Sequence, residues 1–509
     1  MKKLYSLFLF AAIVIAGQAQ YVQPDATFGV DGNVFPPFYG FDLMSEGRCM
    51  DMTSSGSLLF AGYAENSTGF DYSSFRLNLN GSVVGNYGVD GQGVQGSDYG
   101  FESFVDCEFL SGNKTLYIGE YLNDNLNNYG YVMMKLTSSG SLDASFSTDG
   151  YEFMNSGSEG VNYLKPELEV DAAGNIYTAF VYDDGGFIPQ IVILKFDANG
   201  NPDMDFNGGE GQLLLQTGEY SQLGDMKIIN DNIYISGFGD GFFLDEYSTF
   251  IGKFDLDGYL DSSFGSDGYF LGSDNYTEIE IFDMHLTASN KLACTGRRGP
   301  DFVVMQLNMD GTWDESFSGD GYFEMTSLPG EVSGLAIESY SNGKLIVAGT
   351  SEVNNEDSAF LCRLNSDGTP DDSFNPDGIY FPSYGDQSAF NDMRLYDDSQ
   401  IIVTGYYNNA EIRNFLVTKF AVSESGVQEM TDNLIHVFPN PTNDHVTVQT
   451  PMASLPTQVN IYSNDGKLVM TARINSPIEQ LNLDEFQPGT YIMQIVEEKK
   501  TSSQLLVKY

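Results

Sequence analysis

The sequence predicts an all-β fold: a seven-bladed β-propeller of four-stranded blades, followed by a small C-terminal immunoglobulin-like β-sandwich. Three observations predict it. A short phrase returns at nearly fixed spacing, the segments between its copies have the pattern of short strands joined by tight turns, and the composition changes after residue 422. A fixed period of this length is typical of stacked or radial units, each one a supersecondary element.

The repeated phrase is an aromatic residue, two variable residues and Asp-Gly, as in FSTDG at 146–150. Successive aromatics are separated by 59, 59, 60, 58, 53 and 57 residues. The copy FNGGEG at 206–211 carries one extra residue. The seven aromatics are Phe28, Tyr87, Phe146, Phe206, Phe264, Phe317 and Phe374.

The segment 317–374 shows one whole unit. A short strand follows the phrase, and further strands are expected at 332–340, 344–350 and 359–365, separated by Gly-containing turns. The other units keep this order, and none has a convincing helical period. Four short strands per unit favour the blades of a propeller over a β-solenoid or a string of sandwiches.

The phrase predicts how the blades join. Its aromatic ring can fill the gap between two twisted sheets, and its Asp-Gly can make a tight turn. A copy at Phe28 comes early in the chain, whereas none follows the last strand at 415–420. If each phrase leads into the outer strand of the preceding blade, residues 28–40 must pair with the last blade, built from 374–420, and close the ring.

Near-complete copies of a longer pattern, LDASFSTDG at 142–150 and LDSSFGSDG at 260–268, resemble the delta-60 repeat of exported bacterial proteins. The resemblance covers roughly 24–422. It implies a propeller, and it supplies no shared catalytic residues. Every blade needs the same turn and the same wedge, which is the aromatic ring between two sheets. We therefore expect the functional residues at positions where the repeats differ.

The N-terminus has the pattern of a signal peptide over residues 1–19. Lys2 and Lys3 supply the positive charge, residues 4–16 are apolar, and small residues precede a cleavage site after Ala19. No other stretch reaches the roughly 18 apolar residues that a membrane helix needs. We therefore expect a mature propeller over 20–422, a polar linker at 423–433 and a second domain at 434–509.

The second domain shows alternating strands and turns, which predict a small β-sandwich. Its motifs resemble the type A sorting domain of the type IX secretion system of Bacteroidetes. The resemblance implies that the type IX machinery is a partner and that the protein is secreted across the outer membrane to the cell surface or the extracellular space. The residues that carry it are Phe438, Pro439, Asn440, Pro441, Gly466, Gly489 and Tyr491.

The formal net charge of −48 excludes most nucleic-acid binding, because so acidic a chain would be repelled by phosphates. Only −2 of it falls in 434–509, which contains 5 basic and 7 acidic residues. Four cysteines do not make a disulfide scaffold. Cys49 and Cys107 occupy similar phases of adjacent repeats, and either a bridge or two buried free thiols fits that placement.

Residues suited to catalysis are scarce. Of the three histidines only His285 lies in the repeats, within FDMHL, and a structural role is favoured for it. Asp255, Asp257 and Asp261 resemble the start of a calcium loop, but the later ligands are missing, so hairpin geometry is favoured over ligation. We expect no catalytic residues and no cofactor, with calcium as the one metal that these turns could admit.

The functional hypothesis that follows is a non-enzymatic binding or adhesion scaffold for an extracellular ligand, either a glycan or a protein. The alternative is a secreted hydrolase acting on polysaccharide or peptide from a carboxylate site in the propeller channel, because carboxylates are abundant. Carboxylates from several blades that converge beyond what the repeat supplies would favour the alternative.

Overall fold

The computed structural model of the chain consists almost entirely of β-strands, and helical structure in the described residues is limited to α1 (Phe206–Gly209) and short 3₁₀ turns. The signal peptide, nearly all of the predicted linker and part of the sorting motif lie outside the described residues. The structure describes residues 21–508 except for 37–42, 68, 90, 96–100, 124–127, 156–164, 184–188, 216–217, 242–246, 273–278, 327, 329, 354–355, 385–386, 410–411, 424–435, 439–441, 443–444, 450–456, 464–466, 476–477 and 497–500.

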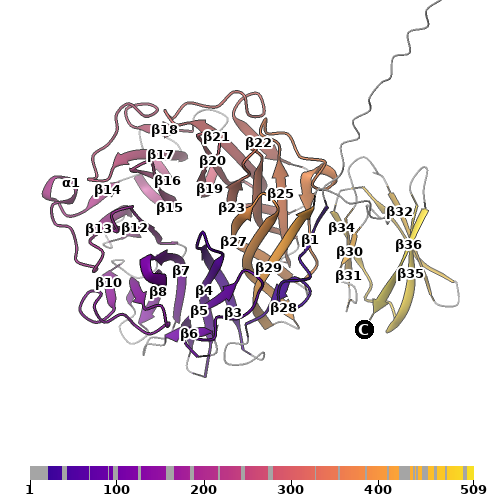
Figure 1. The fold of residues 1–509 in the computed structure, drawn as a ribbon. Helices are drawn as coiled ribbons and strands as arrows, with labels where there is room; N and C mark the ends of the chain where they lie inside the picture. Colours follow the sequence, from indigo (N-terminus) through magenta and orange to yellow (C-terminus); the bar gives the residue numbers. More distant parts are fainter. Residues whose placement is uncertain are drawn as a thin grey trace, which may run out of the picture.

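Between residues 21 and 423 the described strands form seven antiparallel sheets, which are arranged around one axis (Figure 1). We number them in chain order. Sheets 1 to 3 contain β3 (Ser45–Met52), β4 (Ser57–Glu65), β5 (Phe70–Asn78) and β6 (Gln92–Gln95); β7 (Phe101–Leu110), β8 (Lys114–Asn123), β9 (Asn128–Leu136) and β10 (Tyr151–Asn155); and β11 (Glu167–Val170), β12 (Ile176–Tyr182), β13 (Gln190–Phe196) and β14 (Leu213–Leu215).

The remaining sheets of the ring repeat this arrangement. Sheets 4 to 6 contain β15 (Gly218–Ile229), β16 (Asn232–Gly241), β17 (Tyr247–Asp255) and β18 (Tyr269–Leu271); β19 (Ile279–Leu286), β20 (Lys291–Arg298), β21 (Asp301–Asn308) and β22 (Tyr322–Met325); and β23 (Glu331–Ser339), β24 (Leu345–Val353), β25 (Glu356–Leu364) and β26 (Ile379–Tyr380). Sheet 7 contains β27 (Gln387–Asp397), β28 (Gln400–Asn409) and β29 (Ile412–Ser423), joined by β1 (Tyr21–Pro24) and β2 (Asn33–Val34).

The first strand of each sheet lies innermost. The seven inner strands contact one another in a closed cycle, in the order β3, β7, β11, β15, β19, β23, β27 and back to β3. The fourth strand of each of sheets 1 to 6 is the outer one, and it follows a copy of the repeated phrase. The predicted all-β propeller of four-stranded units is therefore confirmed.

The ring closes through its N-terminal residues, as the number of phrases predicts. Strand β1 pairs with β29 from Tyr21 opposite Ser423 to Pro24 opposite Phe420. Strand β2 pairs with the same strand, placing Asn33 opposite Thr418. Lys419 also contacts the chain just before the first phrase, where its ammonium lies 3.0 Å from a carboxylate oxygen of Asp25.

The phrase aromatics lie at the boundaries between sheets. Each of them is at most 1% exposed and belongs to an apolar cluster that contains side chains of two neighbouring sheets. Phe317, for example, packs with Phe302 of β21 and with Val347 of β24. A large ring fills the space that two twisted sheets leave between them, which explains why every copy retains one.

Charged groups reinforce this contact. In most copies an aspartate three residues before the aromatic binds a basic side chain, as Asp143 binds Lys114 at 2.7 Å and Asp371 binds Arg363 at 2.7 Å. Basic side chains of the third strands also lie over the rings, as Arg363 does over Phe374 at 4.7 Å. The phrase and the aspartate before it thus join neighbouring sheets, and their side chains contact other residues of the protein.

The C-terminal domain is a small sandwich of two antiparallel sheets (Figure 1). Val446, Val459 and Met493 belong to one buried core that draws on both sheets, which is how a sandwich is stabilised. One sheet contains β30 (His436–Phe438), β31 (His445–Gln449) and β34 (Ile478–Asn482), and the other contains β33 (Leu468–Ile474), β32 (Thr457–Ser463), β35 (Gly489–Val496) and β36 (Thr501–Lys508).

Replacing a phrase aromatic tests whether its ring stabilises the contact between two sheets as a wedge. We expect Phe317→Ala to lower the free energy of unfolding by about 3–5 kcal/mol, because a buried ring is lost and a cavity remains between sheets 5 and 6. Chemical denaturation of the full chain measures this value. Phe153→Ala is the control, since Phe153 is 48% exposed, and an equal loss in both variants would contradict the wedge.

Candidate functional site

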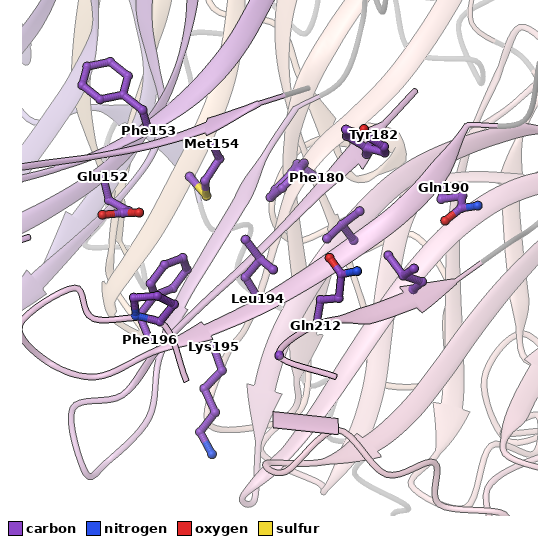
Figure 2. A pocket seen from close by; sticks show the side chains of 14 residues that line it. Glu152, Phe153, Met154, Phe180, Tyr182, Gln190, Leu194, Lys195, Phe196 and Gln212 are labelled. Carbon is purple, nitrogen blue, oxygen red and sulfur yellow. The ribbon is translucent and has the colours of Figure 1, made fainter. Parts of the chain in front are cut away.

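A groove of about 450 Å³ lies between sheets 2 and 3 (Figure 2), and the outer strands β10 and β14 contribute to its lining. Strand β10 of sheet 2 forms one wall, and strands β12, β13 and β14 of sheet 3 form the other. The lining includes the side chains of Glu152, Phe153, Tyr182, Gln190, Lys195 and Gln212.

Strand alternation explains why the groove is partly apolar. Because side chains point to opposite faces in turn, Val192, Leu194 and Phe196 of β13 face sheet 2 together. They pack with Phe146 in the cluster that joins these two sheets. The apolar wall continues outward to Leu214 of β14, which is 45% exposed. The groove therefore presents apolar surface to solvent.

The irregular phrase forms one end of the groove. In four regular copies the N–H of the final glycine donates to the carbonyl of the aromatic four residues earlier, as Gly150 does to Phe146 at 2.7 Å, and Gly32, Gly268 and Gly321 bond in the same way. In the copy FNGGEG the bond runs from Gly211 to Phe206, five residues earlier, at 3.0 Å. The extra residue predicted from the sequence is present, and the groove is lined by Gly211, the last residue of this copy, and by Gln212, which follows it.

The charged groups in the groove have protein partners, whereas its amides do not. Glu152 accepts a hydrogen bond from the Ser147 hydroxyl, and the Lys195 ammonium donates to the Leu256 carbonyl at 3.0 Å and lies 3.2 Å from Asp257. Among the described residues, the side-chain amides of Gln190 and Gln212 have no hydrogen-bond partner. The groove thus offers rings and neutral amides to a ligand.

A second polar region surrounds the ring axis, where four aspartates clamp neighbouring inner strands together. Each accepts a hydrogen bond from a backbone N–H of the next sheet, at 2.7–2.9 Å. Such bonds satisfy buried donors, so these carboxylates have a structural role. The four pairs of carboxylate and N–H are Asp106 with Leu168, Asp225 with Met284, Asp283 with Ile337, and Asp392 with Met50.

Two residues beyond the clamp position, the side chains differ from sheet to sheet. Lys227 lies 3.3 Å from Asp225 and 3.5 Å from Glu169, and His285 lies 3.6 Å from Glu338. This set of side chains differs from one sheet to the next, and its charges alternate in sign around part of the ring. Its members are Asp51, Glu108, Glu169, Lys227, His285, Glu338 and Arg394.

Burial among like charges shifts the titration of this set. Burial raises the pKa of Glu169 and of Glu338 to about 7, and it raises that of Glu108 well above its usual value. Burial also lowers the pKa of His285 to about 4, so this imidazole is neutral near pH 7. Perturbed carboxylates of this kind occur in catalytic sites and in structural charge networks alike.

The calcium candidates serve their own turns. Asp255 accepts hydrogen bonds from the N–H groups of Asp257 and Tyr259, and Asp257 is paired with Lys195. A hydrogen bond from Lys253 lowers the pKa of Asp261 to about 2. Within the described residues no group of three or more His, Cys, Asp or Glu side chains could hold a metal ion. Calcium binding at these turns stays a prediction.

The cysteines, His285 and part of the sorting motif lie within the described residues. All four cysteines are free and buried. His285 bonds to the Ser339 hydroxyl at 3.1 Å. Of the sorting motif, Gly489 and Tyr491 lie in β35 and Phe438 ends β30, whereas Pro439, Asn440, Pro441 and Gly466 lie outside the described residues.

The side chains of the groove were missed at the sequence level. Phe153, Tyr182 and Gln190 lie on strands that read like those of any other unit, so nothing marks them. The extra residue in FNGGEG at 206–211 was the one available signal, since it marks the irregular unit that lines the groove.

Comparisons with known families match one segment in each of the two parts of the chain. Residues 436–509 match the secretion system C-terminal sorting domain, and residues 341–374 match a β-propeller domain of unknown function (DUF5122). The first match confirms the predicted sorting domain. The protein is therefore a propeller exported by the type IX secretion system to the cell surface or the extracellular space. Among the described residues, no helix is both long enough and apolar enough to cross a membrane.

No curated protein matches the chain by sequence. Similar solved structures include a streptogramin B lyase (10% identity, 80% of this chain and 98% of the lyase covered, TM-score 0.38). An ulvan lyase (11%, 82% and 97%, 0.39) and an α-L-arabinofuranosidase from Fusarium graminearum (8%, 80% and 98%, 0.36) are also similar. At such identities the likeness concerns the fold only, and we assign no activity from it.

The raised pKa of Glu338 near the ring axis predicts how the stability of the protein depends on pH. The folded chain keeps a proton on Glu338 up to a pKa of about 7, against an ordinary value of 4.5. Between these values the folded state binds more protons than the unfolded state, so this group lowers stability as the pH rises through the window. We expect Glu338→Gln to weaken the fall in thermal midpoint between about pH 5 and about pH 8.

Differential scanning calorimetry of the full chain at both pH values measures the effect. Glu315→Gln is the control, because Glu315 is exposed to solvent. If the two variants show the same pH dependence as the parent, Glu338 does not hold a raised pKa in the folded ring.

Proposed function

We propose that the protein is an exported binding protein that holds a neutral glycan in the groove between sheets 2 and 3. The observation that carries this proposal is the location of the groove beside the irregular phrase, whose extra residue places Gly211 and Gln212 in its wall. A scaffold needs the same joint at every boundary, so a departure at one boundary indicates a role beyond folding.

The chemistry of the lining favours an uncharged ligand rich in hydroxyl groups. Exposed ring surface such as that of Phe153 can cover the apolar face of a sugar, and unpaired amides such as Gln190 and Gln212 can both donate and accept hydrogen bonds. Binding sites commonly combine apolar walls with a few such polar groups. Glu152 and Lys195 are occupied by protein partners, and they leave no free charge to select a charged ligand.

The overall charge points in the same direction. With a formal net charge of −48, the surface repels acidic polysaccharides and leaves neutral ones unaffected. Export to the cell surface or the medium brings the groove to where such polymers occur.

A hydrolase is the second candidate, and the axial carboxylates favour it. Glu338 and Glu169, with pKa values raised to about 7, are suited to proton transfer near neutrality. Against it, four of the surrounding aspartates already bind backbone N–H groups, and Glu169 accepts another from Ile228 at 3.2 Å. We therefore favour binding over catalysis.

A glycan array probed with the labelled full-length chain tests the proposal, with released reducing ends measured in parallel. We expect binding to neutral oligosaccharides without cleavage. Phe153→Ala and Gln212→Ala should each weaken it roughly tenfold, since a lost ring contact or hydrogen bond costs about 1–1.5 kcal/mol.

The control variants remove the same types of side chain, a glutamine and an aromatic residue, from positions outside the groove lining. Gln92 follows the phrase at Tyr87 as Gln212 follows the phrase at Phe206, and Tyr259 is an exposed aromatic outside the groove lining. Gln92→Ala and Tyr259→Ala should bind like the parent chain. Cleavage that is abolished by Glu338→Gln would overturn the binding role in favour of the hydrolase.

A further inference from the structure

We propose that Cys49 and Cys107 form a disulfide in the exported protein, joining the inner strands of sheets 1 and 2. Cys49 lies on β3 and Cys107 on β7, and these two inner strands are in contact with each other. Both side chains are 2% exposed and belong to one apolar cluster that contains residues of both sheets. The structure describes the reduced form of this pair.

The pair occupies the position of a clamp. Elsewhere on the inner strands, an aspartate of one sheet accepts a hydrogen bond from the N–H of a particular residue in the next, as Asp392 does from Met50 at 2.7 Å. Cys49 stands where the aspartate would be, and Cys107 is the residue whose N–H would donate. That N–H instead bonds to the side chain of its own neighbour Asp106, at 2.8 Å. A covalent link would therefore take the place of the missing hydrogen bond.

Contacts on both sides of the pair hold the two strands at a fixed spacing. On one side the Arg48 guanidinium donates to the Ser103 hydroxyl at 3.2 Å. On the other side the N–H of Phe109 donates to Asp51 at 2.6 Å. A disulfide requires a particular separation and orientation of the two chains, and these flanking bonds restrict both.

The export route brings the chain through a compartment in which a disulfide can form. A chain that crosses the outer membrane first passes through the periplasm, where disulfides form and persist. The Cys49 thiolate attacks the disulfide of an oxidised dithiol oxidoreductase and displaces one of its sulfurs as a thiolate. The Cys107 thiolate then attacks the Cys49 sulfur and releases the second donor sulfur, so that two electrons and two protons pass to the donor.

The timing follows from burial. In the folded ring, burial raises the pKa of the Cys49 thiol and raises that of Cys107 well above its usual value, so few thiolates are present. The exchange must therefore occur before sheets 1 and 2 close on each other. The link then lowers the conformational entropy of the unfolded chain, which stabilises the folded ring.

Alkylation of the secreted full-length protein tests the link. The protein is collected from the medium or the cell surface, denatured in excess maleimide without reductant, and analysed by intact mass and peptide mapping. We expect two alkylated cysteines, Cys294 and Cys362, and four after reduction. A linked peptide should contain Cys49 and Cys107, and reduction should lower the midpoint of thermal unfolding.

Two variants distinguish this link from incomplete alkylation. Cys49→Ser should yield three alkylated cysteines without reductant, because Cys107 is set free. Cys294→Ser, the matched control, should yield one. Four alkylated cysteines in the unreduced parent protein would overturn the proposal, as would a Cys49 or Cys107 linked to glutathione or to a second chain.

Discussion

The packing of one sheet against the next is the interaction on which this structure depends. No sheet of the ring is self-sufficient, because its apolar face is covered by its neighbour and the aromatic of the connecting phrase fills the gap. A linear stack of such units would leave two faces uncovered. The pairing of β1 and β2 with β29 removes those ends by joining the first residues of the ring to its last strand.

This constraint separates residues that support the fold from residues that are free to serve function. The phrase aromatics, the aspartates before them and the axial clamps all bind partners within the protein. The units differ elsewhere, among other places in the charged side chains two residues beyond the clamp position and in the groove wall to which Gly211 and Gln212 contribute. A repeat protein can acquire a specific site at such places without losing the joints that hold it together.

Much of the architecture could be predicted from the sequence, because period and alternation are local patterns. The phrase at Phe317 indicated the strand order of its unit, and the early copy at Phe28 predicted how the ring closes. The inner clamps could not be foreseen, since Asp225 and Met284 are 59 residues apart in sequence and meet only in the folded ring. The groove was equally hidden, because Phe153 lies in sheet 2 whereas Gln212 directly precedes β14 of sheet 3.

If the departure from the repeat at 206–211 creates the proposed binding site, restoring the regular length of this phrase should remove it. A side chain added at Gly209 would meet no neighbouring atom, and deleting this residue would return FNGGEG to the length of the other phrases. We expect this variant to fold with the thermal midpoint of the parent and to lose binding on the glycan array. Unchanged glycan binding by the folded variant would contradict the claim.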